Sequence, residues 1–338
     1  MINEVVKLIT PKRLEVFFEE EKMDTDTVVV KPTYMSICAA DQRYYQGQRQ
    51  KKILDKKLPL ALIHEAIGHV IYDPENKMDK GERVVMIPNT PMTDDEVIKE
   101  NYRRNSLFRS SSANGFMQNA IYMRRDRVIP LKEIDDEVGT LMELASVSIN
   151  AIDSFDKESH SRRDVIGVWG CGSVGYITAL FLKLTFPNSK IVALGTTKEK
   201  LNYFSFADEL KIISEVDEDF KVDHAFECVG GKKSEEAIAQ IIDCIQPQGT
   251  IALMGVSEEA VPINTRMVLE KGLNLIGNSR SGYDDFVKAV EISQNSHVQE
   301  YLNNIISERI NIDDINDIHT AFEHDLNNDF KTVMKWNL

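Results

Sequence analysis

The stretch "VIGVWGCGSVGYITALFL", residues 165–182, places three glycines in the spacing G-x-G-x-x-G between a strand-like and a helix-like run. In such a strand–turn–helix unit, the first glycine permits the tight turn and the second lets the backbone approach a pyrophosphate. The third lets the helix pack closely on the strand. Amide groups at the start of the helix also favour phosphate. The stretch predicts a dinucleotide site formed by Gly170, Gly172, Ser173, Val174 and Gly175.

The chain around this motif alternates between strand-like and helix-like segments. After the motif come the apolar runs "KIVALG", "VDHAFECVG", "GTIALMGV" and "LNLIGNS", and most are separated by stretches of helical length. This alternation is typical of βαβ units that build a parallel sheet. Residues 165–182 are also uncharged, but their four glycines favour strand, turn and helix over a membrane span. We expect a doubly wound cofactor domain over residues 146–279.

The flanking regions have a different pattern. Residues 1 to about 90 carry short β-branched runs broken by Pro, Gly and Asp, which predict an antiparallel, barrel-like domain within residues 1–145. The polar residues 92–114 are expected to be part helix and part loop. In the tail, residues 280–338, apolar residues at helical spacing precede a final strand-like run, "KTVMKW". We expect this tail to pack back on the N-terminal domain.

Composition and charge exclude several classes of partner. The 338 residues carry a formal net charge of −14, which repels nucleic acid and anionic membrane surfaces. The four cysteines show no CxxC spacing, so a reducing cytoplasm is expected. The N-terminus mixes charged with apolar residues and lacks the layout of a signal peptide. The sequence therefore predicts a cytoplasmic protein whose anionic ligands are held by a local site.

The segment "ALGTTKEKL" distinguishes between the two nicotinamide dinucleotides. NAD sites usually place an acid at the end of this strand, where it accepts hydrogen bonds from the ribose and would repel a 2′-phosphate. Here Gly195 occupies that position. The groups that follow offer hydroxyls and positive charge, which favours NADP(H): Thr196, Thr197, Lys198 and Lys200. The alternative is that the two lysines only form a solvated helix face.

Potential metal ligands occur in three distant segments: Cys38, the pair His64-Glu65, and Glu143. A thiolate, an imidazole and a carboxylate can build a zinc site that keeps an open position, as catalytic zinc requires. Spacing alone leaves a second interpretation. A lone cysteine is often a small buried hydrophobe, and a single His-Glu pair is often structural.

The motifs "SICAADQRYY", "HEAIGHV", "ELASVSINAI" and "GVWGCGSVGYITA" together resemble the zinc-dependent medium-chain dehydrogenase/reductase superfamily, especially its polyol dehydrogenases. The segments "MIPNTP", "FRSSSANGFMQ", "DHAFECVGG" and "GNSRSG" are similar to those of NADPH-dependent ribulose-5-phosphate reductases, also called ribitol-5-phosphate dehydrogenases. Those enzymes supply ribitol phosphate for teichoic acid or capsule synthesis. The resemblance implies an α/β protein with a GroES-like catalytic domain and a Rossmann domain that binds NADPH.

The resemblance also implies site residues. Cys38, His64 and Glu143 match the catalytic zinc positions, and Glu65 matches an adjacent carboxylate that can ligate zinc or exchange with water or substrate. Many relatives relay a proton through a hydroxyl residue where this chain has Ala40, so zinc-bound water, Glu65 or Tyr44 is expected to replace it. Relatives often carry a four-cysteine structural zinc lobe near residues 90–110, and this chain has no cysteine there. One catalytic zinc and no structural zinc are expected.

The implied reaction is reduction of the C2 ketone of ribulose 5-phosphate. Arginine suits bidentate phosphate binding, and Arg43 and Arg109 are the preferred candidates for the substrate phosphate. Two alternatives are a dehydrogenase of an unphosphorylated polyol or alcohol, and a non-catalytic dinucleotide-binding sensor or partner subunit. The superfamily implies a homo-oligomer, a dimer or tetramer. The pathway implies a ribitol-5-phosphate cytidylyltransferase as a possible partner.

Overall fold

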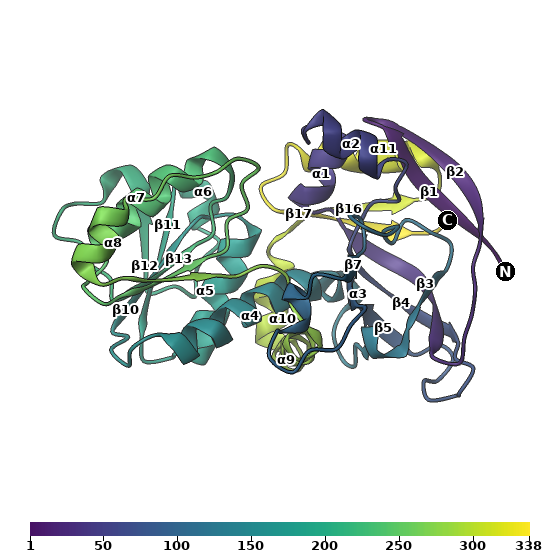
Figure 1. Ribbon diagram of the computed structural model, residues 1–338, viewed down its shortest axis with the longest axis horizontal. Coiled ribbons are helices and arrows are strands. Elements are labelled where there is room, and N and C mark those ends of the chain that lie inside the picture. The colour runs from purple at the N-terminus through teal and green to yellow at the C-terminus, as the bar shows by residue number, and fades with distance from the viewer. The chain divides into compact units, whose positions relative to one another are not determined.

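The computed structural model describes all residues from 1 to 338, and the chain divides into two compact units (Figure 1). The first unit combines Met1–Ser146 with Ser281–Leu338, and the second unit is Val147–Arg280. Helix α4 (Met142–Glu158) begins in the first unit and continues into the second. The first unit is therefore discontinuous in sequence. No helix in the chain is both long enough and apolar enough to cross a membrane.

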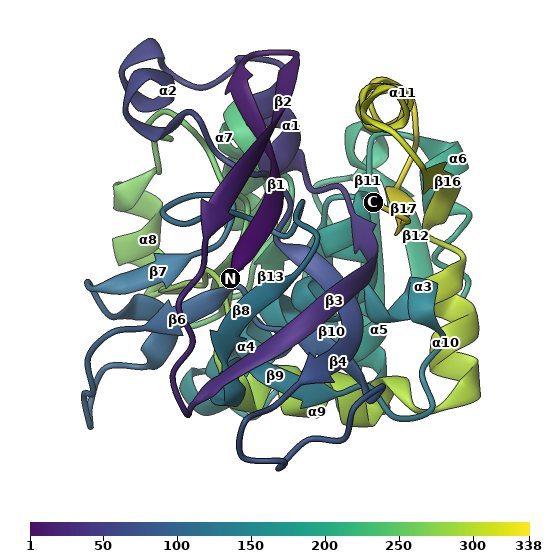
Figure 2. The same cartoon turned by 90° about the vertical axis from the view of Figure 1, so that its right-hand side faces the viewer.

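The main sheet of the first unit has seven strands. Strand β3 is its central member, pairing antiparallel with β4, β8 and β17, as Figure 2 shows for β3, β4 and β8. Two separate hairpins, β1–β2 and β6–β7, complete the strands. In sheet order the strands are β16 (Ile306–Ile312), β17 (Lys331–Trp336), β3 (Thr27–Ser36), β4 (Glu65–Tyr72), β5 (Arg83–Met86) and β9 (Val128–Pro130), with β8 (Ile121–Arg124) beside β3. The hairpins are β1 (Ile2–Thr10), β2 (Arg13–Glu20), β6 (Asn89–Pro91) and β7 (Ser106–Phe108).

Short helices cover this unit. They are α1 (Ala39–Tyr45), α2 (Lys51–Lys57), α3 (Asp136–Gly139), α9 (Tyr283–Ser293), α10 (Ser296–Asn303) and α11 (Ile315–Asp325), with 3-10 turns η1 (Glu100–Tyr102) and η2 (Arg125–Arg127). Helix α11 and strand β17 come from the tail and contribute Phe322, Met334 and Trp336 to the same core as Met35 of β3. The prediction for residues 92–114 is only partly right, because that segment includes strand β7 and one 3-10 turn.

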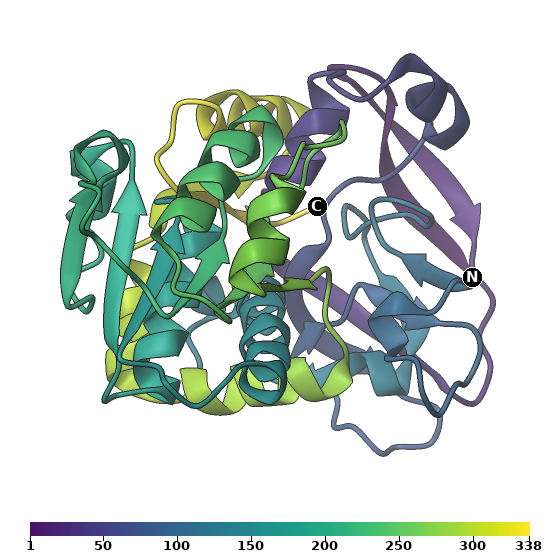
Figure 3. The same cartoon turned by 60° about the vertical axis from the view of Figure 1, so that its left-hand side comes forward.

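The second unit contains one parallel sheet of six strands. Their order is β12 (Glu209–Ile212), β11 (Lys190–Gly195), β10 (Val165–Trp169), β13 (His224–Glu227), β14 (Thr250–Leu253) and β15 (Asn274–Gly277). The helices are α5 (Ser173–Thr185), α6 (Lys198–Leu201), α7 (Ser234–Cys244) and α8 (Thr265–Lys271), with 3-10 turns η3 (Ile213–Glu215) and η4 (Gly231–Lys233). Figure 3 shows these helices against the sheet, and α5 contacts β10 and β11. The predicted fold class is confirmed, as are five of the six strands.

The strand order fixes where a ligand can bind in this unit. From β10, the chain builds outward through β11 and β12 on one side, and through β13, β14 and β15 on the other. In such sheets, ligands bind beyond the carboxyl ends of the strands at the point where the order reverses. That point lies between β10 and β13, and the glycine motif directly follows β10.

His224, the first residue of β13, is engaged through both of its ring nitrogens. Its Nδ1 accepts the amide of Thr250 at 3.0 Å, and its Nε2 lies 3.0 Å from the carbonyl oxygen of Arg162, to which it donates. Burial, followed by neighbouring His160, lowers the pKa of His224 to about 4, from 6.5. Because the folded pKa is the lower one, the neutral ring stabilises the fold above pH 6.5, and this contribution is lost as the pH falls toward 4.

We therefore expect the second unit to unfold at a lower urea concentration as the pH is lowered from 6.5 to 4. In a Trp336→Phe background, the fluorescence of Trp169, which lies in β10 of the same sheet, reports this transition. The variant His224→Gln keeps a donor and an acceptor but does not titrate, so its midpoint should change less over this range. Equal pH profiles for the two proteins would show that His224 is not the responsible group.

Candidate active site

Cys38, His64 and Glu65 come together in the first unit. Cys38 is the N-cap residue of α1, two residues after the end of β3, and His64 directly precedes Glu65, the first residue of β4. Antiparallel pairing of the two strands sets Ser36 opposite Glu65, which brings both segments to the same end of the sheet. One ligand atom from each of the three residues lies within 4.8 Å of the others. The structure thus gathers a sulfur, an imidazole nitrogen and a carboxylate oxygen.

Asp41 orients the imidazole of His64. Its Oδ2 lies 3.2 Å from Nδ1 of His64, while its Oδ1 accepts from the Ile63 amide at 3.0 Å and from Ser110 Oγ at 2.5 Å. With Nδ1 engaged in this way, Nε2 is the ring nitrogen left for a metal ion. Asp41 lies three residues after Cys38 in "CAADQ", so its place in the first turn of α1 was the available sequence signal.

His64 and Asp41 each favour the charged form of the other. Burial favours neutral groups, but the Asp41 carboxylate and the Cys38 sulfur outweigh it and raise the pKa of His64 well above its ordinary value. Burial likewise opposes ionisation of Asp41, and His64 and the hydrogen bonds more than compensate, so the pKa of Asp41 is lowered. A bound cation would take the place of the imidazole proton, since metal ligands must be deprotonated.

The peptide before His64 is held in a strained conformation. Ile63 is β-branched and has a φ of 70°, a region that costs such residues roughly 1–3 kcal/mol. Its amide donates to Asp41, and its carbonyl oxygen accepts from the Phe116 amide at 2.8 Å. These bonds and complete burial fix the backbone that presents His64.

Glu65 belongs to a buried ion pair with Lys331 of β17. Nζ of Lys331 lies 2.6 Å from each carboxylate oxygen of Glu65 and also donates to the Ile37 carbonyl at 3.2 Å, while Ser36 Oγ donates to Glu65. Burial would lower the pKa of Lys331, but Glu65 and Cys38 outweigh it and raise this pKa. Both oxygens of Glu65 thus accept hydrogen bonds from Lys331. The role of Glu65 as a metal ligand or proton donor stays a prediction.

Glu143, the second residue of α4, lies outside the 4.8 Å cluster. It is buried, and burial raises its pKa to about 7, with His64 lowering the pKa and Glu65 raising it. These influences place Glu143 within electrostatic reach of both residues. Its assignment as a zinc ligand stays a prediction.

The donor set fits zinc. Cysteine sulfur, histidine nitrogen and carboxylate oxygen are the ligands that zinc takes, and three protein ligands leave a fourth position open in catalytic sites. Cys38, His64 and Glu65 meet the requirement for proximity, and the contact of His64 Nδ1 with the Asp41 carboxylate is the kind of outer contact that fixes a metal-binding imidazole.

Three other predicted residues of the first unit lie as follows. Tyr44 belongs to the apolar core and packs its ring 4.8 Å from the guanidinium of Arg49. Arg109 donates to the carbonyl oxygens of Asn114 and Tyr122, and burial lowers its pKa to about 10. Arg43 is half-buried in the last turn of α1. Two of the guanidinium nitrogens of Arg109 therefore bind backbone carbonyl oxygens, which its sequence context did not indicate.

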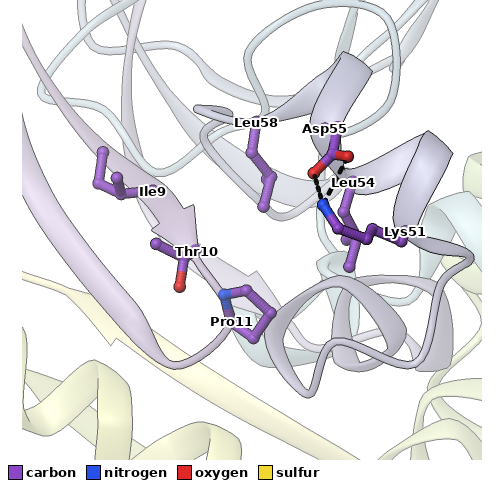
Figure 4. Close-up of a pocket in the computed structure, with 7 residues that line it drawn as sticks. All are labelled: Ile9, Thr10, Pro11, Lys51, Leu54, Asp55 and Leu58. Atoms are coloured by element: carbon purple, nitrogen blue, oxygen red, sulfur yellow. Dashed lines mark hydrogen bonds and ion pairs between the residues drawn. The ribbon is translucent and has the colours of Figure 1, made fainter.

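A surface hollow of about 460 Å³ lies elsewhere in the first unit (Figure 4). Its lining residues are Ile9, Thr10, Pro11, Lys51, Leu54, Asp55 and Leu58. Lys51 binds Asp55 across one turn of α2, at 2.7 and 2.9 Å. Neither the predicted metal ligands nor the two preferred phosphate candidates, Arg43 and Arg109, line this hollow.

In the second unit, the glycine motif has the geometry that a pyrophosphate needs. Gly170 has a φ of 122°, and a Cβ there would lie 2.8 Å from the carbonyl oxygen of Cys228. A Cβ on Gly175 would lie 1.9 Å from the carbonyl oxygen of Gly170, whereas one on Gly172 would meet nothing within 4 Å. The first and third glycines are thus required by packing. The backbone at Gly172 faces open space, which fits a bound dinucleotide.

The predicted 2′-phosphate residues lie together where β11 ends and α6 begins. Thr197 is the N-cap residue of α6, with its hydroxyl 3.5 Å from that of Thr196. Thr196 and Lys198 are exposed, and Lys200 is half-buried. Their role in binding the cofactor stays a prediction.

Glu227 is a residue of this unit that the sequence did not single out. Its Oε1 accepts from the amides of Val229 and Gly230 and from the hydroxyl of Ser234, and its Oε2 accepts from the amide of Gly255. The carboxylate therefore ties together the loops that follow β13 and β14, next to the glycine motif. Its position at a strand end in "AFECVGG" was the available signal.

A Cys-His-carboxylate cluster in a β-rich unit, in a chain that also contains a doubly wound unit with a dinucleotide motif, defines the class of zinc-binding dehydrogenases. Comparison with protein families agrees. Residues 24–133 match the alcohol dehydrogenase GroES-like domain, and residues 187–295 match the zinc-binding dehydrogenase family. The chain belongs to the zinc-dependent medium-chain dehydrogenase/reductase family.

Among curated proteins, the chain is similar over its full length to ribulose-5-phosphate reductases. The chain is 47% identical to ribulose-5-phosphate reductase of Bacillus spizizenii, with all of both chains covered. It is 48% identical to ribulose-5-phosphate reductase 1 of Staphylococcus aureus, with 99% of each covered. The crystal structure of S. aureus TarJ in complex with NADPH superimposes with a TM-score of 0.89 at 44% identity, again over all of both chains.

Proposed function

We propose that the protein reduces D-ribulose 5-phosphate to D-ribitol 5-phosphate with NADPH, at one catalytic zinc. The observation that carries the proposal is the meeting of Cys38, His64 and Glu65 within 4.8 Å in a chain of this family. Relatives named ribulose-5-phosphate reductase, 44–48% identical over essentially their full length, support the substrate. The TarJ structure with NADPH supports the cofactor.

The chemistry requires a hydride at C2 and a proton at the ketone oxygen. Zinc, when bound, supplies Lewis acidity toward that oxygen, and NADPH supplies the hydride. The protein's own residues position these groups: Asp41 orients His64, and Lys331 with Ser36 holds the carboxylate of Glu65. Ala40 offers no hydroxyl for a relay, and Tyr44 lies in the apolar core. Of the expected proton sources, this leaves Glu65, whose carboxylate would first have to part from Lys331, and a water molecule at the site.

The finer features of the proposal are one zinc per chain, a homo-oligomer, a cytoplasmic location, and use of the product by a ribitol-5-phosphate cytidylyltransferase for teichoic acid or capsule. The region that holds a second zinc in many relatives has no cysteine here. Arg127 instead binds Glu100 at 2.8 Å and Asp126 at 3.1 Å near this segment. Metal analysis of the purified protein should give one zinc per chain.

The deciding assay follows NADPH oxidation with ribulose 5-phosphate and with ribulose, before and after removal of metal by a chelator. We expect turnover of the phosphorylated sugar only, loss of turnover with the metal, and recovery on addition of zinc. Turnover of ribulose alone would favour a dehydrogenase of unphosphorylated polyols. No turnover of either sugar would favour a non-catalytic dinucleotide-binding protein, and activity that survives complete metal removal would exclude the zinc mechanism.

A further inference from the structure

Cys171, the residue between the first two glycines of the dinucleotide motif, fills the space beside Gly195. A Cβ built on Gly195 would lie 2.6 Å from both Cβ and Sγ of Cys171, and 3.2 Å from Cδ2 of Leu201. Real Cβ atoms essentially never approach other heavy atoms to under 3.0 Å. As long as Cys171 stays in place, position 195 therefore has no room for a side chain.

The surrounding structure holds Cys171 in place. Strands β10 and β11 run in parallel, with Trp169 paired to Leu194, and the Gly170 amide donates to the Leu194 carbonyl at 2.8 Å. The turn that carries Cys171 is thus bonded directly to the strand end that carries Gly195. Cys171 is also buried, so its side chain has little freedom to turn away.

Position 195 is the position at which NAD-dependent dehydrogenases of this fold place an acid for the ribose hydroxyls. A carboxylate there would also repel a 2′-phosphate. We propose that Cys171 is a specificity-determining residue: by excluding a side chain at position 195 it excludes this acid and directs the site toward a dinucleotide with a 2′-phosphate. This inference rests on the NADPH preference in the proposed function.

The first experiment measures kcat/KM with NADPH and with NADH for four proteins: wild type, G195D, C171G and the double variant C171G/G195D. Glycine is needed at position 171 because the Cβ of Cys171 takes part in the clash as well as its sulfur. We expect G195D alone to lose NADPH activity without gaining NADH activity. In the double variant the carboxylate has room to accept ribose hydrogen bonds, so the ratio of NADH to NADPH activity should rise about ten- to hundredfold over G195D.

A second experiment tests the clash without reference to the cofactor. G195A adds only a Cβ, so its melting temperature should drop by several degrees in the wild-type background and change little in the C171G background. This cycle gives a result even where the aspartate variants fold poorly.

The possible outcomes distinguish failure of the role of Cys171 from failure of the proposed NADPH preference. A wild-type enzyme that prefers NADH would overturn the proposed cofactor and leave the stability cycle valid. A G195D variant that uses NADH well with Cys171 present, or equal effects of G195A in both backgrounds, would overturn the role of Cys171. A folded double variant with no gain over G195D would also overturn it.

Discussion

Replacing Cys38 by serine is expected to lower kcat about a thousandfold while NADPH binds with an unchanged Kd. The change removes the sulfur from the cluster of the first unit. Lewis-acid stabilisation by a metal is worth several kcal/mol, and each 1.36 kcal/mol corresponds to a factor of ten in rate. The glycine motif that is proposed to bind NADPH lies in the second unit and is not altered. Steady-state kinetics, NADPH fluorescence titration and metal analysis check the three parts of this expectation.

The matched control is Cys244→Ser, which makes the same change at a buried thiol of the second unit, at the end of α7. Its kcat and zinc content should stay within about twofold of wild type, since this thiol lies in the second unit and is not part of the ligand cluster. A Cys38→Ser protein that keeps both its zinc and its rate would show that Cys38 is not a ligand.

Replacing Lys331 by methionine is expected to destabilise the first unit by about 3–5 kcal/mol. The change leaves the Glu65 carboxylate fully buried without its cation, and breaking a buried ion pair on one side costs about this much. The double variant K331M/E65Q removes the unpaired charge as well, so part of the loss should be recovered. The midpoint of urea unfolding is the measurement.

The two tryptophans allow the units to be followed separately. Trp336 lies in β17, on the same strand as Lys331, and Trp169 lies in the second unit. In a Trp169→Phe background, the fluorescence transition reports the first unit. Lys335→Met, an exposed lysine of the same strand, is the control and should change stability by less than about 0.5 kcal/mol. Similar effects of the two lysine variants would mean that the pair with Glu65 contributes little.

The second unit was the more predictable part of the fold because its signals are local. Apolar runs, helical lengths and glycine spacing predicted five strands and the motif, all of which the structure shows. Strand β12, "ELKI", was missed since it is short, polar and lies at the edge of the sheet with no residue fully buried.

The sequence predicted three residues that the structure brings together in the candidate site, but it did not predict the groups that hold them. Cys38 and the His64-Glu65 pair were chosen by residue type, and the pairing of β3 with β4 brings them together. Lys331 was missed because it lies 266 residues from Glu65 in sequence, and only the pairing of β17 with β3 makes them neighbours. Ion pairs formed by distant strands leave no local pattern, whereas Asp41 could have been found from its place in the turn after Cys38.

The discontinuous first unit has a consequence for the order of events on the ribosome. Every residue of the second unit is synthesised before β17, and domains generally fold as units during synthesis. Until then the nascent chain holds Cys38, His64 and Glu65 without Lys331, the cation paired with Glu65, and without β17, one of the three strands that pair with β3. Closure of the seven-stranded sheet must wait for β17, so the first unit is completed only after all of the second unit has been synthesised.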